Sequence, residues 1–200
     1  MTIQELNQEL GNIDLFLLDQ ILKGRFEQAA RILEVGCGEG RNLTYFIRNG
    51  YDVWGIDHNP TALQMLRMIG RSLHKNFDKE KFIEAEITGI PFPPQSFDAI
   101  ICSAVLHFSP SEEAFFAALD KMVKVLRKGG CMFLSMLSNM NHHGKTAHNE
   151  GNMQNDRFLL TEGLYSAVLQ RYELQEIEPT RTVIAGDAQA TAYLILKKES

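Results

Sequence analysis

Three glycines at alternate positions, with acidic residues before and among them, are the sequence feature that most clearly points to chemistry. Gly36, Gly38 and Gly40 follow a short apolar segment, with Glu34 ahead of the run and Glu39 inside it. Glycine lets a chain reverse tightly and lets a ligand approach bare backbone. A pyrophosphate would meet like charge at this loop, whereas a ligand that carries an ammonium and a sulfonium would be attracted.

The spacing of the glycines also differs from that of dinucleotide-binding loops. In the pattern Gly-x-Gly-x-x-Gly the third glycine comes one position later, where this chain has Arg41. The loop therefore favours S-adenosylmethionine over NAD as its ligand.

Strands and helices are predicted to alternate from residue 31 onward, which is typical of an α/β fold with a parallel sheet. Apolar segments predict strands at 31–35, 52–57, 81–87, 97–103, 131–137, 172–178 and 190–197. Helical spacing predicts helices at 40–48, from 60 through 69, from 111 to 128 and at 161–171. Residues 2–28 predict one or two amphipathic helices with a break at Gly11–Asn12.

Further polar residues follow the predicted strands, where ligands of such sheets bind. Asp57 ends the second strand and Glu86 the third, while Ser103 ends the fourth and precedes His107. A carboxylate in the position of Asp57 can accept hydrogen bonds from both hydroxyls of a ribose. The alternative is a carboxylate that stabilises the start of the helix after Asn59.

The heptapeptide Glu34–Gly40 resembles the first motif of class I S-adenosylmethionine-dependent methyltransferases, acid-x-Gly-x-Gly-x-Gly. The resemblance extends from about Arg31 to Lys198 and is to small-molecule enzymes with methyltransferase domains of type 11 or 25. It implies a Rossmann-like three-layer α/β/α sandwich. Its mostly parallel seven-stranded sheet would have the strand order 3-2-1-4-5-7-6, an antiparallel last strand and an N-terminal helical extension.

The resemblance also implies a set of cofactor-binding residues. The family usually has aspartate where this chain has Glu86; that residue reaches the adenine amino group, and the next backbone N–H contacts a ring nitrogen. The alternative for Glu86 is a solvated loop carboxylate. The predicted cofactor-binding residues are Glu34, Gly36, Cys37, Gly38, Gly40, Asn42, Asp57, His58, Glu86, Ile87 and Ser103.

His107 is the candidate catalytic residue. It lies in a Val-Leu-His sequence similar to that of small-molecule methyltransferases, and the Asn/Asp-Pro-Pro-Tyr motif of amino-methylating enzymes is absent. A histidine can remove a proton from a substrate hydroxyl near neutral pH. We favour the alternative, a histidine that is hydrogen-bonded behind the cofactor.

Residues 138–157 are rich in Ser, Asn, His and Gly and predict one long irregular loop, a candidate lid over the acceptor. His142, His143 and His148 lie in this loop without a nearby cysteine or paired carboxylate, so we predict polar lid residues and no metal site. A single domain over 1–200 is expected, with 1–28 as a helical cover.

Composition limits the partners. The net charge is −5 and no basic stripe is present, so nucleic acid is a disfavoured substrate. The polar, acidic N-terminus, the absence of a long apolar run and three cysteines without metal-binding or redox spacing indicate a cytoplasmic protein that does not enter membranes.

The sequence thus predicts transfer of a methyl group from S-adenosylmethionine to an oxygen, nitrogen or sulfur of a small molecule, with S-adenosylhomocysteine as product. A tRNA wobble-uridine methyltransferase is one alternative, because residues 101–108 also resemble the fourth motif of those enzymes. A non-catalytic S-adenosylmethionine-binding module is another. The acceptor and the oligomeric state are left open.

Overall fold

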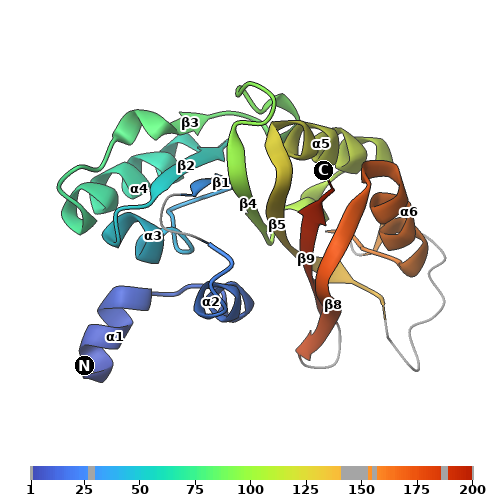
Figure 1. Ribbon diagram of the computed structural model, residues 1–200, viewed down its shortest axis with the longest axis horizontal. Helices are drawn as coiled ribbons and strands as arrows, with labels where there is room; N and C mark the ends of the chain where they lie inside the picture. Colours follow the sequence, from blue (N-terminus) through green and yellow to red (C-terminus); the bar gives the residue numbers. More distant parts are fainter. Residues whose placement is uncertain (1, 27–29, 141–152, 155–156, 186–188, 200) are drawn as a thin grey trace.

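The computed structural model describes residues 2–26, 30–140, 153–154, 157–185 and 189–199, and a seven-stranded sheet forms its centre (Figure 1). The strands are β1 (Arg31–Val35), β2 (Asp52–Asp57), β3 (Phe82–Glu84), β4 (Phe97–Ser103), β5 (Leu126–Ser138), β8 (Leu174–Ala185) and β9 (Gln189–Lys198). Their order is β3-β2-β1-β4-β5-β9-β8, and β9 runs antiparallel to both of its neighbours. The predicted fold class and strand order are confirmed.

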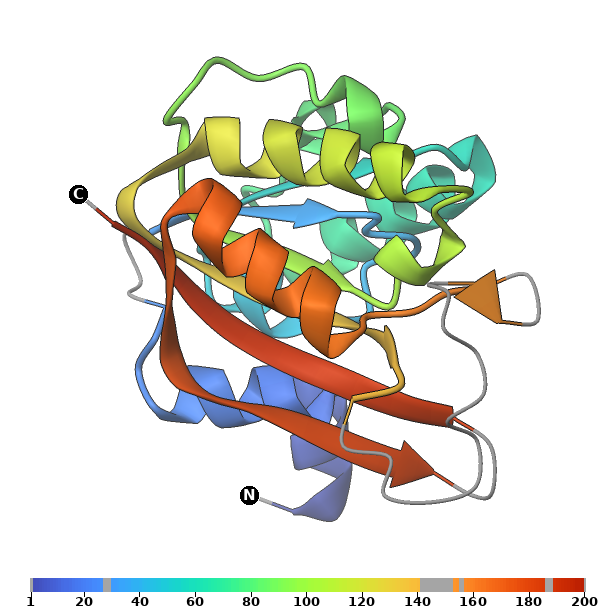
Figure 2. The same ribbon diagram turned by 90° about the vertical axis from the view of Figure 1, so that its right-hand side faces the viewer.

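Helices cover both faces of the sheet and make three layers (Figures 1 and 2). They are α1 (Ile3–Leu10), α2 (Leu15–Leu22), α3 (Thr44–Arg48), α4 (Pro60–Leu73), α5 (Glu112–Val125) and α6 (Glu162–Tyr172), with short 3₁₀ turns η1 (Lys79–Lys81), η2 (Ile87–Gly89) and η3 (Leu106–Phe108). Successive side chains of a strand point to opposite faces. Ile32 of β1 accordingly packs on the side of α2, α3 and α4, and Leu33 on the side of α5 and α6.

Side-chain caps fix where several helices begin. Asn59 accepts hydrogen bonds from the backbone N–H groups of Thr61 and Ala62, and Pro60 occupies the first turn of α4, as predicted. Helix α3 has no side-chain cap and starts at Thr44. The predicted helix over 40–48 was therefore too long, because the chain is still turning between Gly40 and Leu43.

Other boundaries also differ from the prediction. Strand β3 ends at Glu84, not at 87, because its partner β2 ends at Asp57, the residue opposite Glu84. Helix α5 ends at Val125, and residues 128–130 belong to β5, whose first residue already pairs with β4 across a register shift. Strand β8 continues past the predicted end at Glu178 as far as Ala185.

The predicted lid is described only in part. Residues 141–152, which include His142, His143 and His148, and residues 155–156 lie outside the described residues. Strands β6 (Met153–Gln154) and β7 (Arg157–Phe158) form an antiparallel pair that, except for Phe158, lies in the stretch predicted to be irregular. The lid function and the single-domain boundary at 1–200 stay predictions.

The two N-terminal helices and the break between them are confirmed. Gly11 ends α1 with φ = 59°, and α1 itself buries no residue. Helix α2 is held by its fully buried Leu17 and by Phe16, whose ring stacks on Tyr193 with 4.0 Å between centroids. It therefore belongs to the packed body of the molecule.

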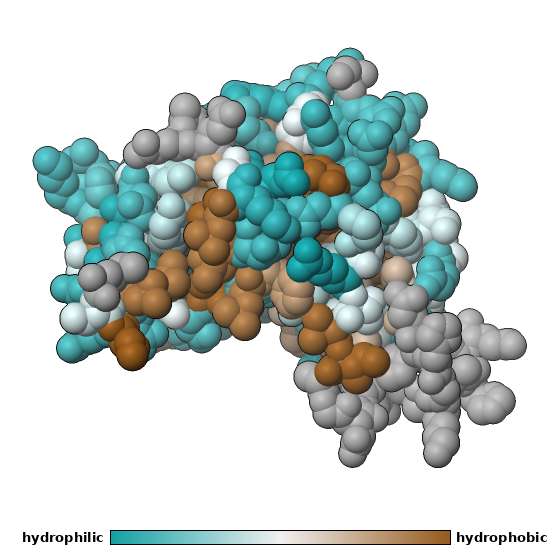
Figure 3. Space-filling view, turned by 60° about the horizontal axis from the view of Figure 1, so that its bottom comes forward, coloured by the Kyte–Doolittle hydropathy of each residue, from teal (hydrophilic) through white to brown (hydrophobic). Residues whose placement is uncertain are grey.

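Large apolar side chains are exposed on several elements, among them Ile3, Leu15 and Leu22 of the N-terminal helices and Ile184 of β8. Figure 3 shows apolar patches interrupted by polar surface on the face it presents. Within the described part of the chain, no helix is long and apolar enough to cross a membrane.

A matched pair of substitutions in α2 tests how this helix is held. Leu17→Ala removes a side chain with no exposed surface and is expected to lower the free energy of unfolding by about 2–5 kcal/mol. Leu15→Ala changes a 76% exposed leucine of the same helix and is expected to stay within about 0.5 kcal/mol. Urea denaturation of both variants provides the measurement. Equal small effects would show that α2 is not part of the core.

Candidate functional site

The three glycines of the loop after β1 all have positive φ, at 73° for Gly36, 51° for Gly38 and 82° for Gly40. A Cβ at Gly36 would lie 2.4 Å from a methyl group of Val105, and one at Gly40 would lie 2.8 Å from Leu66. A Cβ at Gly38 would meet nothing within 4 Å. Packing thus requires glycine at the first and third positions, while the second leaves open backbone that a ligand can approach.

Asp57 lies at the carboxyl end of β2 and holds this loop. Its Oδ2 accepts a hydrogen bond of 2.7 Å from the Gly38 N–H, and its Oδ1 accepts one of 2.8 Å from the Asn59 N–H. A carboxylate offers about four lone-pair sites, and these two hydrogen bonds use two of them. His58 Nδ1 also lies 3.7 Å from Oδ1, so Oδ2 has the clearer remaining capacity for a ligand. The predicted ribose role and the alternative role near the start of α4 are therefore compatible.

A cavity of about 660 Å³ lies between the ends of β2 and β4. It brings together three residues that were predicted to bind the cofactor, His58, Glu86 and Ile87, although Glu86 lies beyond the end of β3. Most of the other lining residues follow β4. The cavity is lined by His58, Glu86, Ile87, Thr88, Val105, Phe108, Ser109, Pro110 and Ala114.

Glu34 is a buried acid in β1, two residues before the first glycine of the loop, with 2% of its surface exposed. Its Oε1 accepts a hydrogen bond of 2.8 Å from the Asn42 side chain. Its Oε2 is buried and has no hydrogen-bond partner among the described residues. Burial raises the pKa of this carboxyl to about 8. A buried oxygen without a partner is costly, so it fits a position that a cationic ligand completes.

Asn42 and Ser103, both predicted to contact the cofactor, are joined to the N-terminal helices. The backbone N–H of Asp14 donates to Oδ1 of Asn42 at 3.0 Å, and the Ser103 hydroxyl donates to Oδ2 of Asp14 at 3.3 Å. Arg41 donates to the same hydroxyl at 3.3 Å. Both side-chain atoms of Asn42 are thus used inside the protein, which gives it a positioning role.

Sequence reasoning did not assign Asp14 or Arg41 to the site. Asp14 caps α2, accepting hydrogen bonds from the N–H groups of Phe16 and Leu17, and an acid just before an apolar helical segment is the signal that could have revealed this cap. Its second contact spans 89 positions of sequence, from Asp14 to Ser103, and no local pattern encodes it.

His107 lies in η3, half-buried beside Phe108. Burial lowers its pKa, and the positive charge of Arg157 lowers it further, so the ring is neutral at neutral pH. Its buried Nδ1 has no hydrogen-bond partner in the described part of the chain, and His107 is not among the residues that line the cavity. The Arg157 guanidinium lies 4.1 Å from the centroid of the Phe108 ring.

Cys37, another predicted cofactor-binding residue, helps to hold the glycine loop through its backbone N–H. The N–H groups of Gly36 and Cys37 both donate to the carbonyl of Ile56, at 2.8 and 3.0 Å, which ties the loop to β2. Burial raises the pKa of the Cys37 thiol, so it stays protonated.

Comparison with known proteins decides the family. The methyltransferase domain family matches residues 33–134, which is just over half of the chain. The chain belongs to this family.

Similar proteins contain this domain as part of longer chains. A ubiquinone biosynthesis O-methyltransferase of Xylella fastidiosa is 31% identical over 121 residues, which cover 60% of this chain and 47% of that protein. A tRNA (carboxymethyluridine(34)-5-O)-methyltransferase of Xenopus tropicalis is 33% identical over 105 residues, 50% of this chain and 14% of that protein. This methyltransferase domain therefore spans about half or less of the length of these relatives.

Solved structures agree on the fold. A SAM-dependent methyltransferase of Methanosarcina mazei superposes with a TM-score of 0.71 at 20% identity, covering 90% of this chain and 97% of that one. The part of the methyltransferase domain matched by sequence, 33–134, contains the glycine loop, Asp57, Glu86 and His107.

The residues of the site fit S-adenosylmethionine, the cofactor that the family implies. The open backbone at Gly38, the free lone pairs of Asp57 and the unpartnered Oε2 of Glu34 offer places for a nucleoside and for a positive charge. Among the described residues, no group of three His, Cys, Asp or Glu side chains could hold a metal ion.

The two kinds of glycine in the loop can be separated by mutation. Gly38→Ala adds a methyl group in open space at positive φ and is expected to cost about 1–2 kcal/mol of folding free energy. Gly36→Ala carries the same strain and also overlaps Val105, so it should cost clearly more. Chemical denaturation of both variants gives the comparison. If Gly36→Ala were the milder change, the packing explanation would be wrong.

Proposed function

We propose that this chain is an S-adenosylmethionine-dependent methyltransferase that acts on an oxygen, nitrogen or sulfur atom of a small molecule. One observation carries the proposal. The Asp57 carboxylate is held against the open Gly38 backbone and keeps acceptor capacity next to His58, which lines the cavity of about 660 Å³. An acid in this position suits the two hydroxyls of a ribose and repels a pyrophosphate.

Each of the other site residues can be assigned to a part of the same ligand. Glu86 and Ile87 line the cavity where an adenine would lie, and His58 lines it next to Asp57. Glu34 offers a carboxyl oxygen to an ammonium. When bound, S-adenosylmethionine supplies an electrophilic methyl group on a sulfonium. The chain's own task is to hold the acceptor atom in line with that group and to exclude water, which can contribute about 7–11 kcal/mol.

His107 can accept a proton where the acceptor atom carries one. Its lowered pKa keeps the ring neutral at neutral pH, which is the form that a general base needs. When the acceptor is already ionised, as a carboxylate is, no general base is needed. A general-base role for His107 is thus confined to a protonated acceptor, whereas the favoured alternative, a histidine behind the cofactor, needs no such acceptor.

A small-molecule acceptor is supported by the similarity to a ubiquinone biosynthesis O-methyltransferase and by the net charge of −5. Similarity to a tRNA methyltransferase supports the alternative acceptor. Transfer of a labelled methyl group to a metabolite pool, compared with transfer to total tRNA, separates the two. Labelling of neither would leave the non-catalytic binding module, and labelling of tRNA alone would overturn the proposal.

Ligand binding tests the cofactor. S-adenosylhomocysteine is expected to stabilise the protein by about 2.7 kcal/mol at a hundredfold excess over Kd, and NAD should give no shift.

The Asp57→Asn substitution should weaken the binding of S-adenosylhomocysteine roughly ten- to a hundredfold, since a charged hydrogen-bond partner is worth about 1.5–3 kcal/mol. Thermal shift and calorimetry provide the data, with circular dichroism as the folding control. Equal shifts from both ligands would contradict the assignment.

Glu34 should couple binding to pH. In the free protein its carboxyl is protonated below a pKa of about 8, and a nearby ammonium lowers that pKa. Binding of S-adenosylhomocysteine near neutral pH should therefore release a proton, and the release should vanish well above the free-state pKa. Calorimetry in buffers of different ionisation enthalpy measures it, and Glu34→Gln is the control. The same proton release in the Glu34→Gln variant would exclude Glu34 as its source.

A further inference from the structure

Arg157 of β7 is a cation without a carboxylate partner beside the cavity. Its guanidinium carbon lies 4.1 Å from the centroid of the Phe108 ring, and Phe108 lines the cavity. Among the described residues, no carboxylate forms an ion pair with Arg157. The residue is half-buried, so water compensates its charge only in part.

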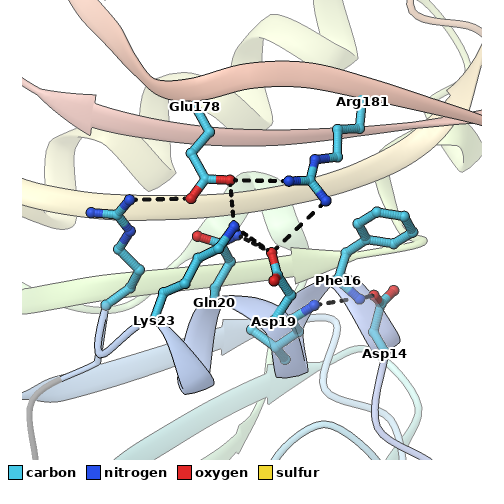
Figure 4. Close-up of polar contacts among 9 residues, drawn as sticks. Asp14, Phe16, Asp19, Gln20, Lys23, Glu178 and Arg181 are labelled. Carbon is cyan, nitrogen blue, oxygen red and sulfur yellow. Dashed lines mark hydrogen bonds and ion pairs between the residues drawn. The ribbon is translucent and has the colours of Figure 1, made fainter.

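Other cations that stack on aromatic rings in this protein have a carboxylate as well. Arg181 lies 5.9 Å from the centroid of the Phe16 ring and forms an ion pair of 3.6 Å with Glu178 (Figure 4). The same holds for the remaining stacked cations, which are Arg31 with Asp52, Lys81 with Asp52 and Arg171 with Asp120. Within the described part of the chain, Arg157 is the exception to this pairing.

The groups next to Arg157 do not compensate its charge. The Phe108 ring attracts the cation but carries no net charge. His107, whose ring centroid lies 4.5 Å from that of Phe108, is neutral at neutral pH because burial and Arg157 both lower its pKa. The chain as a whole has a net charge of −5 and so does not attract anions. A cation held at this place is therefore a local position for a negatively charged group.

Ser109 gives a second, independent indication of a ligand. It follows Phe108 in the chain, lines the same cavity and is 4% exposed. Its Oγ is buried and has no hydrogen-bond partner among the described residues. A buried hydroxyl without a partner is costly, so this one fits a position where a ligand atom accepts its hydrogen bond.

Two walls of the cavity differ in charge. The wall that follows β2 and β3 contains Glu86 and is the one assigned above to the nucleoside. The wall that follows β4 contains Phe108, with the Arg157 guanidinium against its ring. An oxyanion is repelled by the first wall and attracted by the second. Apart from Ser109, the second wall is apolar, with Val105, Phe108, Pro110 and Ala114.

We propose that Arg157 and Ser109 bind an oxyanion group of the methyl acceptor, a carboxylate or a phosphate, and that the apolar part of the acceptor packs against Phe108. The inference rests on the proposed function and deepens it, since it narrows the acceptor to small molecules with an anionic group and an apolar body. A guanidinium can donate two parallel N–H groups to two oxygens of such a group. Arg157 and Ser109 are thus specificity-determining residues for the acceptor.

Fractionation of the acceptors tests the inference on the wild-type chain. A metabolite pool freed of macromolecules is separated by anion exchange at neutral pH, and each fraction is incubated with the protein and S-adenosylmethionine that carries a labelled methyl group. Label is expected in the retained, anionic fraction. Phosphatase treatment of that fraction before the assay distinguishes the two oxyanions, because a phosphate acceptor loses its labelling and a carboxylate acceptor keeps it.

Substitution of Arg157 tests the cation. Arg157→Met keeps an apolar side chain next to Phe108 and removes the charge. It should raise the concentration of the retained fraction that gives half-maximal transfer roughly ten- to a hundredfold, because hydrogen bonds to a charged group are lost. Arg157→Lys, which keeps the charge, should recover part of this loss. The affinity of both variants for S-adenosylhomocysteine, measured by calorimetry, should stay within about twofold of wild type, since other elements hold the cofactor.

Arg171→Met is the matched control. Arg171 also stacks on a phenylalanine, with 4.6 Å to the centroid of the Phe116 ring, but it pairs with Asp120. Neither Arg171 nor Phe116 lines the cavity. Its replacement should leave transfer to the retained fraction unchanged.

Ser109→Ala tests the hydroxyl. Because the Oγ has no partner in the described part of the chain, its loss should not lower Tm. Transfer to the retained fraction should nevertheless fall about tenfold at low acceptor concentration. A purely structural serine would give the reverse, a lower Tm with unchanged transfer.

The outcomes are distinct. Transfer to the unretained fraction alone, or equal transfer by wild type and Arg157→Met, would overturn the inference and leave the proposed function intact. An equal loss of S-adenosylhomocysteine binding in Arg157→Met would show that Arg157 supports the cofactor site, and would overturn the inference too. Wild-type protein that neither binds S-adenosylhomocysteine nor transfers label to any fraction would refute the proposed function itself.

Discussion

The hydrogen bond from the Gly38 N–H to the Asp57 carboxylate is the contact on which the site depends. It joins the loop after β1 to the end of β2, and it does so at the position where the loop has open space beside the backbone. A charged acceptor makes the bond strong, and the mostly buried position of Asp57 shields it from water. The same carboxylate therefore shapes the loop and presents its remaining lone pairs to a ligand.

Glu34 is a second acid next to this loop, and it is buried. The interior disfavours its charge, and only one of its oxygens is satisfied, by Asn42. Asn42 in turn accepts from the backbone of Asp14, so the state of Glu34 is linked to the N-terminal helices. These hydrogen bonds join residues that are far apart in sequence at one end of the sheet.

The sequence was sufficient for the fold and for the residues that follow the strands. Glycine spacing and strand–helix alternation are local patterns, so the loop, Asp57 and β4 were predicted where they lie. It was insufficient where tertiary contacts decide. Strand β3 ends early because β2 does, and Glu86 lines the cavity from the position just before the 3₁₀ turn η2 instead. Arg41 was interpreted only as a missing glycine, because its contact with Ser103 depends on how β4 packs beside β1.

The end of β4 shows how packing and ligand access are combined. Ala104 has φ = 60°, a strained value for a residue with a side chain, and its N–H donates to the Ser135 carbonyl at 2.9 Å. The next residue, Val105, occupies the space that a side chain at Gly36 would need and also lines the cavity. The chain can pass this close to the glycine loop only because Gly36 has no Cβ. The glycine motif is therefore required by the neighbouring strand as much as by any ligand, and a sequence that kept Gly38 alone would lose the cavity wall.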